Sequence, residues 1–330
     1  MKEYELEILE QYDIETGNTR KGRGVYLLDT DRGPLLLKKT AASEHKMELL
    51  ELLGKQLAEN GYPNTDLPVR NREGKLVTAA EDGDCYIVKR WFNGRECNVQ
   101  KDYEIMEAVR NLAYLHNILK LPLPTEEVIP ESQGLLEEFE LHNRELKKIR
   151  AFIRKRTGKG EFEMAFLKYF EQMYEIADRA TARLKRMEST RAAAAEPDCE
   201  AIVHGDYNYH NILMLPMGIA TVNFDNFRMD VQSADLYYFM RKLLEKHQWD
   251  PFLGEQMIHS YTLIHPIAAW EMTYLALRLA YPEKFFKVAN AYYQSNKAKV
   301  PEKSLEKLLA AVRETDRKRR FLEEIFAFHL

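Results

Sequence analysis

The sequence contains few cysteines and no long apolar run. Its three cysteines, Cys85, Cys97 and Cys199, are odd in number and lack CxxC spacing. This argues against a disulfide framework or a structural zinc site and favours a reducing compartment. No apolar stretch approaches the roughly 18 residues that a membrane span requires, and the charged N-terminal residues show no signal-peptide pattern. We therefore expect a cytoplasmic protein with no membrane partner.

An excess of one charge is also lacking, because 48 Lys and Arg residues face 52 Asp and Glu residues, for a net charge of -4. This balance removes the electrostatic argument for a nucleic-acid partner. No internal repeat of roughly 20 to 50 residues is present, which argues against solenoids and propellers. The chain does have an ordinary globular composition, 45% hydrophobic and 30% charged, and its 330 residues suffice for two domains or two lobes.

Residues 1–93 combine short strand-like runs with one helix. The four runs form two predicted hairpins, 25–29 with 34–38 and 75–78 with 85–88. Ser43 is a typical N-cap and predicts a helix that extends to about Asn60. A Gly-bearing break follows, so we predict that residues 1–93 form one lobe and residues 94–330 a second.

The second predicted lobe is mainly helical. Apolar residues recur at helical spacing over residues 102–116 and again over residues 162–187, which predicts two amphipathic helices. Two short strand-like runs, 211–215 and 219–224, then predict a hairpin. Only helices are expected from there to the C-terminus.

A polar loop between apolar flanks is the most informative segment. It contains His204, then Asp206 two positions later, then Asn211 five positions after the Asp. This is the pattern of a phosphoryl-transfer loop, in which the Asp accepts the proton of the attacking hydroxyl and the Asn carbonyl oxygen binds a magnesium ion. Structural readings stand beside it: Asp206 caps the turn through its own backbone, and His204 and His210 are half-buried histidines with satisfied nitrogens.

With this loop and the hairpin after it, the chain resembles the superfamily of aminoglycoside phosphotransferases and choline kinases. Within that superfamily it is most similar to the spore coat protein S (CotS) family. The segments that carry the resemblance are 23–26, 35–38, 93–97, 112–116, the loop from His204, and 235–236 with Arg241. The resemblance implies a protein-kinase-like α+β fold in two lobes, a small antiparallel β-sheet lobe that binds nucleotide and a larger, mostly helical lobe.

The resemblance also implies roles for the residues of the loop and of the first lobe. Asp206 takes the place of the catalytic base, Asn211 that of a metal ligand, and His204 braces the loop. Lys38 would contact the phosphates of ATP, and its ion partner would be Glu44 or Glu48. Because alternate residues of a strand point to opposite faces, Lys39 is the register alternative to Lys38.

Further parts of the nucleotide site follow from the same resemblance. The segment 90–94, with Trp91 and Phe92, would be the hinge that meets adenine. Gly22 and Gly24 would let a hairpin approach the phosphate oxygens, although a plain hairpin glycine pair reads equally well. The implied cofactors are ATP and Mg2+.

One position departs from the pattern of active relatives. Asn223 stands where they carry an Asp that binds magnesium, and an Asn lacks the negative charge that a hard dication favours. Asp225, two residues on, is the candidate replacement ligand, provided that the strand end twists.

Two functions of different class follow. The first is a magnesium-dependent phosphotransferase that moves the ATP γ-phosphate to a small-molecule hydroxyl. The second is a catalytically weak or inactive kinase-like protein, a pseudokinase, that serves in the spore coat, binding nucleotide or other coat proteins.

Overall fold

The computed structural model of the chain describes residues 8–22, 24–81, 83–123, 125, 128–194, 200–295 and 302–329. Arg23 and Cys199 therefore lie outside the described residues. The chain forms two compact units, one of residues 1–130 with 201–235 and one of residues 131–200 with 236–330. These two units differ from the two predicted lobes, residues 1–93 and residues 94–330. The assignment of nucleotide binding to residues 1–93 stays a prediction.

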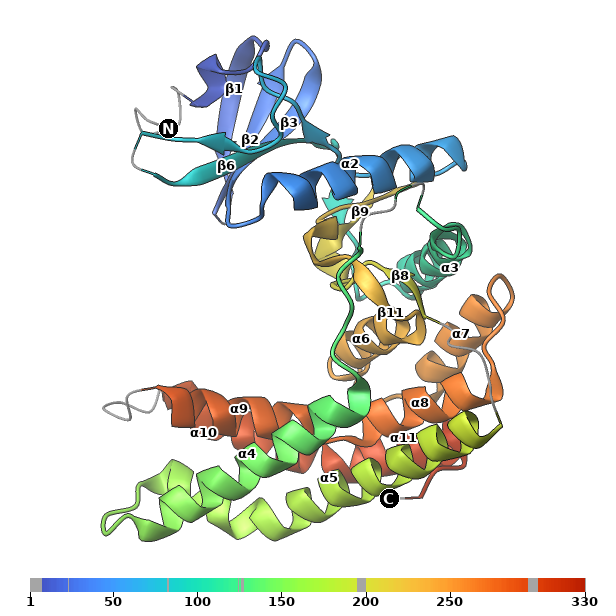
Figure 1. Cartoon of the computed structure of the whole chain (residues 1–330). Coiled ribbons are helices and arrows are strands. Elements are labelled where there is room, and N and C mark those ends of the chain that lie inside the picture. The colour runs from blue at the N-terminus through green and yellow to red at the C-terminus, as the bar shows by residue number, and fades with distance from the viewer. Residues whose placement is uncertain are drawn as a thin grey trace. The chain divides into compact units, whose positions relative to one another are not determined.

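An antiparallel sheet dominates the N-terminal part of the first unit (Figure 1). Its strands are β1 (Thr16–Lys21), β2 (Val25–Thr30), β3 (Gly33–Thr40), β4 (Pro68–Val69), β5 (Thr78–Ala79) and β6 (Cys85–Arg90). They follow the order β1-β2-β3-β6-β4, and β5 also pairs with β6. The predicted hairpin of β2 and β3 forms around Gly33, whose φ of 91° suits glycine. The second hairpin is shorter than predicted, because β5 has only two residues.

The helix of this unit's N-terminal part, α2 (Glu44–Glu59), begins and ends where the sequence predicts. The Ser43 side chain caps it by accepting a hydrogen bond from the backbone N–H of Lys46 at 3.3 Å. Gly54 allows close packing, because a Cβ there would lie 1.7 Å from Cδ2 of Leu67. The helix is thereby fixed against the segment that leads into β4.

The rest of the first unit contains α3 (Asp102–Leu119), which extends the predicted helix, and several short strands. These strands are β7 (Arg95–Glu96), β8 (Glu200–Val203), β9 (Ile212–Met214), β10 (Ile219–Thr221) and β11 (Arg228–Val231). The predicted hairpin is β9 with β10, and β7 joins β9. The expectation of helices alone beyond residue 224 is wrong, since β11 pairs with β8. Strands this short show no alternating pattern over enough residues to be recognised.

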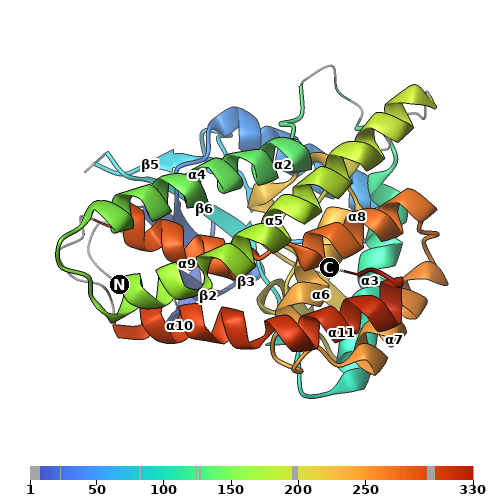
Figure 2. The ribbon, with the colours of Figure 1, turned by 90° about the horizontal axis from the view of Figure 1, so that it is seen from below.

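The second unit is helical. Its helices are α4 (Leu135–Lys155), α5 (Glu161–Ala193), most of α6 (Ser233–Leu244), α7 (Pro251–Thr262), α8 (Ala269–Ala280), α9 (Glu283–Gln294), α10 (Glu302–Arg313) and α11 (Thr315–Phe326). Figure 2 shows α4 and α5 side by side, and their apolar faces enclose a buried core with α9 and α10. The long periodic run around residues 162–187 is part of α5, as predicted.

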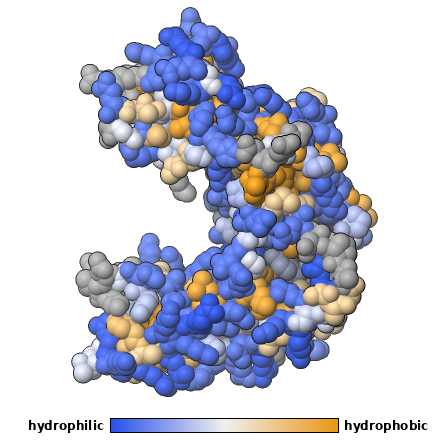
Figure 3. All heavy atoms as spheres, viewed as in Figure 1, coloured by the Kyte–Doolittle hydropathy of each residue, from blue (hydrophilic) through white to orange (hydrophobic). Residues whose placement is uncertain are grey.

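Hydrophilic residues cover most of the visible face of the molecule (Figure 3). Within the described ranges, every helix is too short or too polar to cross a membrane.

Candidate functional site

The polar loop after β8 is held in place by a buried carboxylate. Asp235, near the start of α6, accepts hydrogen bonds from the backbone N–H groups of His204 (2.7 Å) and Gly205 (2.9 Å). Burial by itself would raise the pKa of Asp235, but hydrogen bonds from His116 and the loop hold it below the ordinary value. Asp235 therefore remains a carboxylate that fixes the loop backbone.

His204 is completely buried, and both of its ring nitrogens form hydrogen bonds with backbone groups. Its Nδ1 accepts from the N–H of Asp206 at 3.1 Å, and its Nε2 lies 3.0 Å from the carbonyl oxygen of Val222. This arrangement requires a neutral ring that donates from Nε2. The ring links the loop to the strand end after β10.

The backbone conformation and the close packing at position 205 require glycine. Its φ is +81°, and a Cβ there would lie 2.1 Å from the carbonyl oxygen of Asn226. Close approach of two backbone segments thus brings the loop beside the short helical turn η2 (Phe224–Asn226).

The Asp206 carboxylate is oriented by two amide side chains. Asn208 Nδ2 donates to one oxygen and Asn211 Nδ2 to the other, each at 3.0 Å. Asn211 also donates to the backbone carbonyl of Asp206 at 2.8 Å. Asp206 is half-buried, and these hydrogen bonds fix the direction of its carboxylate. Such a group can accept a proton from a bound hydroxyl.

Asn223 lies beside this loop. Its Nδ2 donates to Oδ1 of Asn211 at 2.8 Å, and its backbone N–H donates to Oδ2 of Asp66 at 2.9 Å. Its φ of 65° is left-handed, a conformation that Asn adopts more readily than most residues. The structure therefore joins Asp206, Asn211 and Asn223 in one chain of hydrogen bonds.

A cluster of two lysines and two aspartates adjoins Asn223. Lys38 of β3 pairs with Oδ2 of Asp225, and Lys89 of β6 lies 2.7 Å from its Oδ1. Lys89 also lies 3.0 Å from Oδ2 of Asp66, and the exposed fractions of these two side chains are 0% and 1%. We call Lys38, Asp66, Lys89 and Asp225 the lysine–aspartate cluster.

Lys89 and Asp225 of this cluster keep their charges. Burial would lower the pKa of Lys89, but the carboxylates of Asp66 and Asp225 raise it above the ordinary value. Burial would likewise raise the pKa of Asp225, but Lys89 and Lys38 lower it well below the ordinary value. Lys89 and Asp66 are not among the residues that the sequence predicts for the site. The signal for Lys89 was a lysine that extends the apolar run of β6, whereas Asp66 lies in a loop without any pattern.

The ion partner predicted for Lys38 is wrong. Lys38 pairs with Asp225, and the exposed Lys39 pairs with Asp84 on the other side of the strand. Glu44 instead accepts the backbone N–H groups of Leu76 (2.7 Å) and Val77 (2.8 Å). Its place at the first residue of α2 puts the carboxylate against these two donors, and Glu48, the other candidate partner, is exposed. Of the two lysines, Lys38 is thus the one that faces Asp225, while a nucleotide contact for it and for Glu44 stays a prediction.

The remaining predicted nucleotide residues lie at both ends of the sheet. Gly22 donates its N–H to the carbonyl oxygen of Val25 at 2.9 Å, and Gly24 has a φ of 73°, so the two glycines shape the β1–β2 turn. Trp91 and Phe92 follow β6 and pack against the apolar residues of β9 and β10. Contacts of these four residues with a nucleotide stay predictions.

The donors predicted for Mg2+ do not fit that ion as they are arranged. Magnesium needs free carboxylate or carbonyl oxygens. Oδ1 of Asn211 already accepts from Asn223, and both oxygens of Asp225 are bound by ammonium groups. Of the three predicted donors, only Asn223 has a side-chain oxygen, Oδ1, that accepts no such bond within the described residues, and one monodentate ligand does not make a site.

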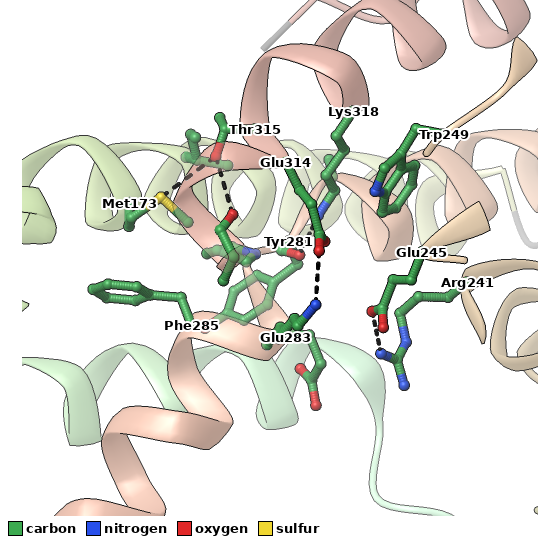
Figure 4. Close-up of a pocket in the computed structure, with 15 residues that line it drawn as sticks. Met173, Arg241, Glu245, Trp249, Tyr281, Glu283, Phe285, Glu314, Thr315 and Lys318 are labelled. Atoms are coloured by element: carbon green, nitrogen blue, oxygen red, sulfur yellow. Dashed lines mark hydrogen bonds and ion pairs between the residues drawn. The ribbon is translucent and has the colours of Figure 1, made fainter. Parts of the chain in front are cut away.

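The second unit has a pocket of its own (Figure 4). Lys318 of α11 reaches into it, donates to the carbonyl oxygen of Tyr281 at 2.8 Å and lies 5.3 Å from the centre of the Trp249 ring. Two ion pairs border the same space, Arg241 with Glu245 and Lys284 with Glu314. Burial lowers the pKa of Lys318 to about 7. No residue predicted from the sequence to act in chemistry lies here.

Solved structures define the class to which this fold belongs. An aminoglycoside phosphotransferase from Alicyclobacillus acidocaldarius has a TM-score of 0.83 at 16% identity, over 98% of this chain and 95% of its own. A spectinomycin phosphotransferase in complex with ADP and spectinomycin has a TM-score of 0.65 at 14% identity, over 98% and 96%. The fold is that of the kinase-like phosphotransferases, α+β with an antiparallel sheet lobe and a helical lobe, as the sequence predicts.

The sequence places the chain more narrowly. It belongs to the family described as "Spore coat putative kinase YutH", which matches residues 5–325. It is also 21% identical over 289 residues to spore coat protein S of Bacillus subtilis (strain 168), across 85% of this chain and 80% of that protein. The predicted resemblance to spore coat proteins of the phosphotransferase superfamily is thus confirmed.

Proposed function

We propose that this protein binds ATP at the first unit and acts as a kinase-like phosphotransferase associated with the spore coat. The observation that carries the proposal is the carboxylate of the half-buried Asp206, held by two side-chain amides at 3.0 Å each. A purely structural loop has no need of an oriented carboxylate. The phosphotransferase complex with ADP and spectinomycin supports a nucleotide and a small-molecule hydroxyl as ligands.

The reaction that this geometry suits is direct transfer. The acceptor oxygen attacks the γ-phosphorus, the bond from the γ-phosphorus to the β,γ-bridging oxygen breaks, and ADP leaves with that oxygen. Asp206 accepts the proton of the acceptor hydroxyl as the new P–O bond forms. Lys38, whose side chain is 16% exposed, can exchange Asp225 for a phosphate oxygen.

A second candidate function is a catalytically weak or inactive coat protein that binds nucleotide. Asn223 and the engaged Asp225 favour it, since neither offers a free carboxylate for a metal. Both candidates predict nucleotide binding, and they differ in turnover.

The experiment compares the wild type with Asp206→Asn in ATP binding and in ADP release. Asp206→Asn keeps the shape of the side chain and removes the base, so we expect at least about a hundredfold loss of turnover. The new amide also loses one of the two hydrogen bonds to Asn208 and Asn211, so turnover is compared at a temperature where both proteins are folded. Asp29→Asn, an exposed site on β2, is the matched control. Equal turnover in wild type and Asp206→Asn would exclude Asp206 as the base. ATP binding without any ADP release in the wild type would favour the second candidate.

A further inference from the structure

We propose that the ammonium group of Lys89 is a built-in replacement for a divalent cation, so that this protein binds ATP without metal. The inference rests on the proposed nucleotide binding at the first unit. It goes further, because it assigns a role to Lys89 and states the ionic form of the ligand, metal-free ATP.

The position of Lys89 is the first argument. Its Nζ bridges Asp225 at 2.7 Å and Asp66 at 3.0 Å. Asp66 in turn accepts the backbone N–H of Asn223 at 2.9 Å. One ammonium group thus pairs with Asp225 and connects it, through Asp66, to the residue that stands in the metal-ligand position. A bound dication would make the same connections.

The charge of the lysine–aspartate cluster also disfavours a bound dication. The lysine–aspartate cluster holds two positive and two negative charges, so it is neutral without a metal. A dication on Asp225 would sit at about 2.1 Å from its oxygen, on the same carboxylate that Lys89 and Lys38 already bind. It would add two positive charges beside two ammonium groups where little water screens them.

The third argument is that the two lysines differ in freedom. The side chain of Lys89 is 0% exposed and cannot turn to solvent without leaving the buried Asp66 carboxylate without its ammonium partner. The side chain of Lys38 is 16% exposed, so it can leave Asp225 for a phosphate group. When Lys38 moves, Lys89 still pairs with both Asp225 and Asp66, so each carboxylate keeps an ammonium partner without a metal.

The experiment measures the dissociation constant of ATP by calorimetry in EDTA and in excess Mg2+. For the wild type we expect the two constants to agree within about threefold. The test variant is Lys89→Met combined with Asp66→Asn, which removes one charge of each sign and frees an oxygen of Asp225. It should bind ATP at least ten times more tightly with Mg2+ than with EDTA.

The matched control is Lys39→Met with Asp84→Asn, an exposed lysine–aspartate pair at the same sheet. The dissociation constants of ATP for this control, in EDTA and in Mg2+, should agree within about threefold, as for the wild type. If the test variant does not unfold cooperatively, the wild-type comparison alone decides, since metal-independent binding is the claim.

A second measurement uses Mn2+ alone, detected by electron paramagnetic resonance on the nucleotide-free full chain. Every protein in this measurement carries His142→Gln, because Glu138, His142 and Glu283 form another cluster of potential ligands. The lysine–aspartate cluster of the wild type should bind no Mn2+, and the test variant should bind one Mn2+ ion per chain.

The outcomes separate the two proposals. ATP binding by the wild type that is more than thirtyfold weaker in EDTA, or a tight Mn2+ ion on the wild-type cluster, overturns the role of Lys89 and leaves the nucleotide proposal intact. Absence of ATP binding in both buffers refutes nucleotide binding and this inference with it.

Discussion

Replacing Asn223 with Asp tests the electrostatics of the site most directly. The change keeps the side-chain shape, and Asp tolerates the left-handed φ of 65° nearly as well as Asn. It converts an amide that donates to Asn211 at 2.8 Å into a carboxylate that faces the same oxygen. Asn211 cannot simply rotate, because its own amide N–H groups hold Asp206.

The magnitude follows from these contacts. Loss of one hydrogen bond costs about 1 kcal/mol, and an unsatisfied polar group left in its place costs about 1–3 kcal/mol. Without metal, Asn223→Asp should therefore lower the free energy of unfolding by about 2–4 kcal/mol. The new carboxylate and the freed oxygen of Asn211 would together form a cation site. Mg2+ at 100 times its dissociation constant would then restore about 2.7 kcal/mol.

The assay is urea unfolding of the variant and the wild type in EDTA and in Mg2+. Asn226→Asp, three residues on and exposed, is the matched control for the added charge and should respond to neither condition. A variant as stable as the wild type in EDTA would refute the role given to the amide of Asn223. A variant whose stability ignores Mg2+ would refute the predicted cation site.

Two further predictions concern the loop and the pocket of the second unit. Gly205→Ala should destabilise the fold by at least about 3 kcal/mol, because its Cβ would meet the backbone of Asn226. Gly218 is also at positive φ but has no close neighbour, so Gly218→Ala should cost about 1–2 kcal/mol. Urea unfolding of both variants measures these costs, and equal costs would contradict the prediction. Burial lowers the pKa of Lys318 to about 7, while an unfolded lysine titrates near about 10.4. Between these values the unfolded chain binds more protons, so stability should rise with pH, by up to about 1.4 kcal/mol per unit. Lys318→Met should abolish this rise, whereas Lys307→Met, a change at an exposed lysine, should leave it intact. Melting curves from pH 6 to pH 10 measure the rise. If it persists in Lys318→Met, another group causes it.

Local patterns in the sequence located three helices, α2, α3 and α5, the β2–β3 and β9–β10 hairpins, and the polar loop. The N-cap Ser43 and the apolar period of α5 are properties of neighbouring residues, so they can be read without the fold. The spacing of His204, Asp206 and Asn211 is equally local, and the structure brings these residues together as one hydrogen-bonded loop.

Only the tertiary structure decided which charges meet. Lys89 and Asp66 are 23 positions apart, and Asp225 follows Lys89 by 136 positions, so no periodicity relates them. The sequence suggested Glu44 as the partner of Lys38, but two backbone N–H groups compete for Glu44, and Asp225 takes its place. Ion pairing in a buried cluster depends on which strands and loops pack together, and that packing is a property of the whole chain.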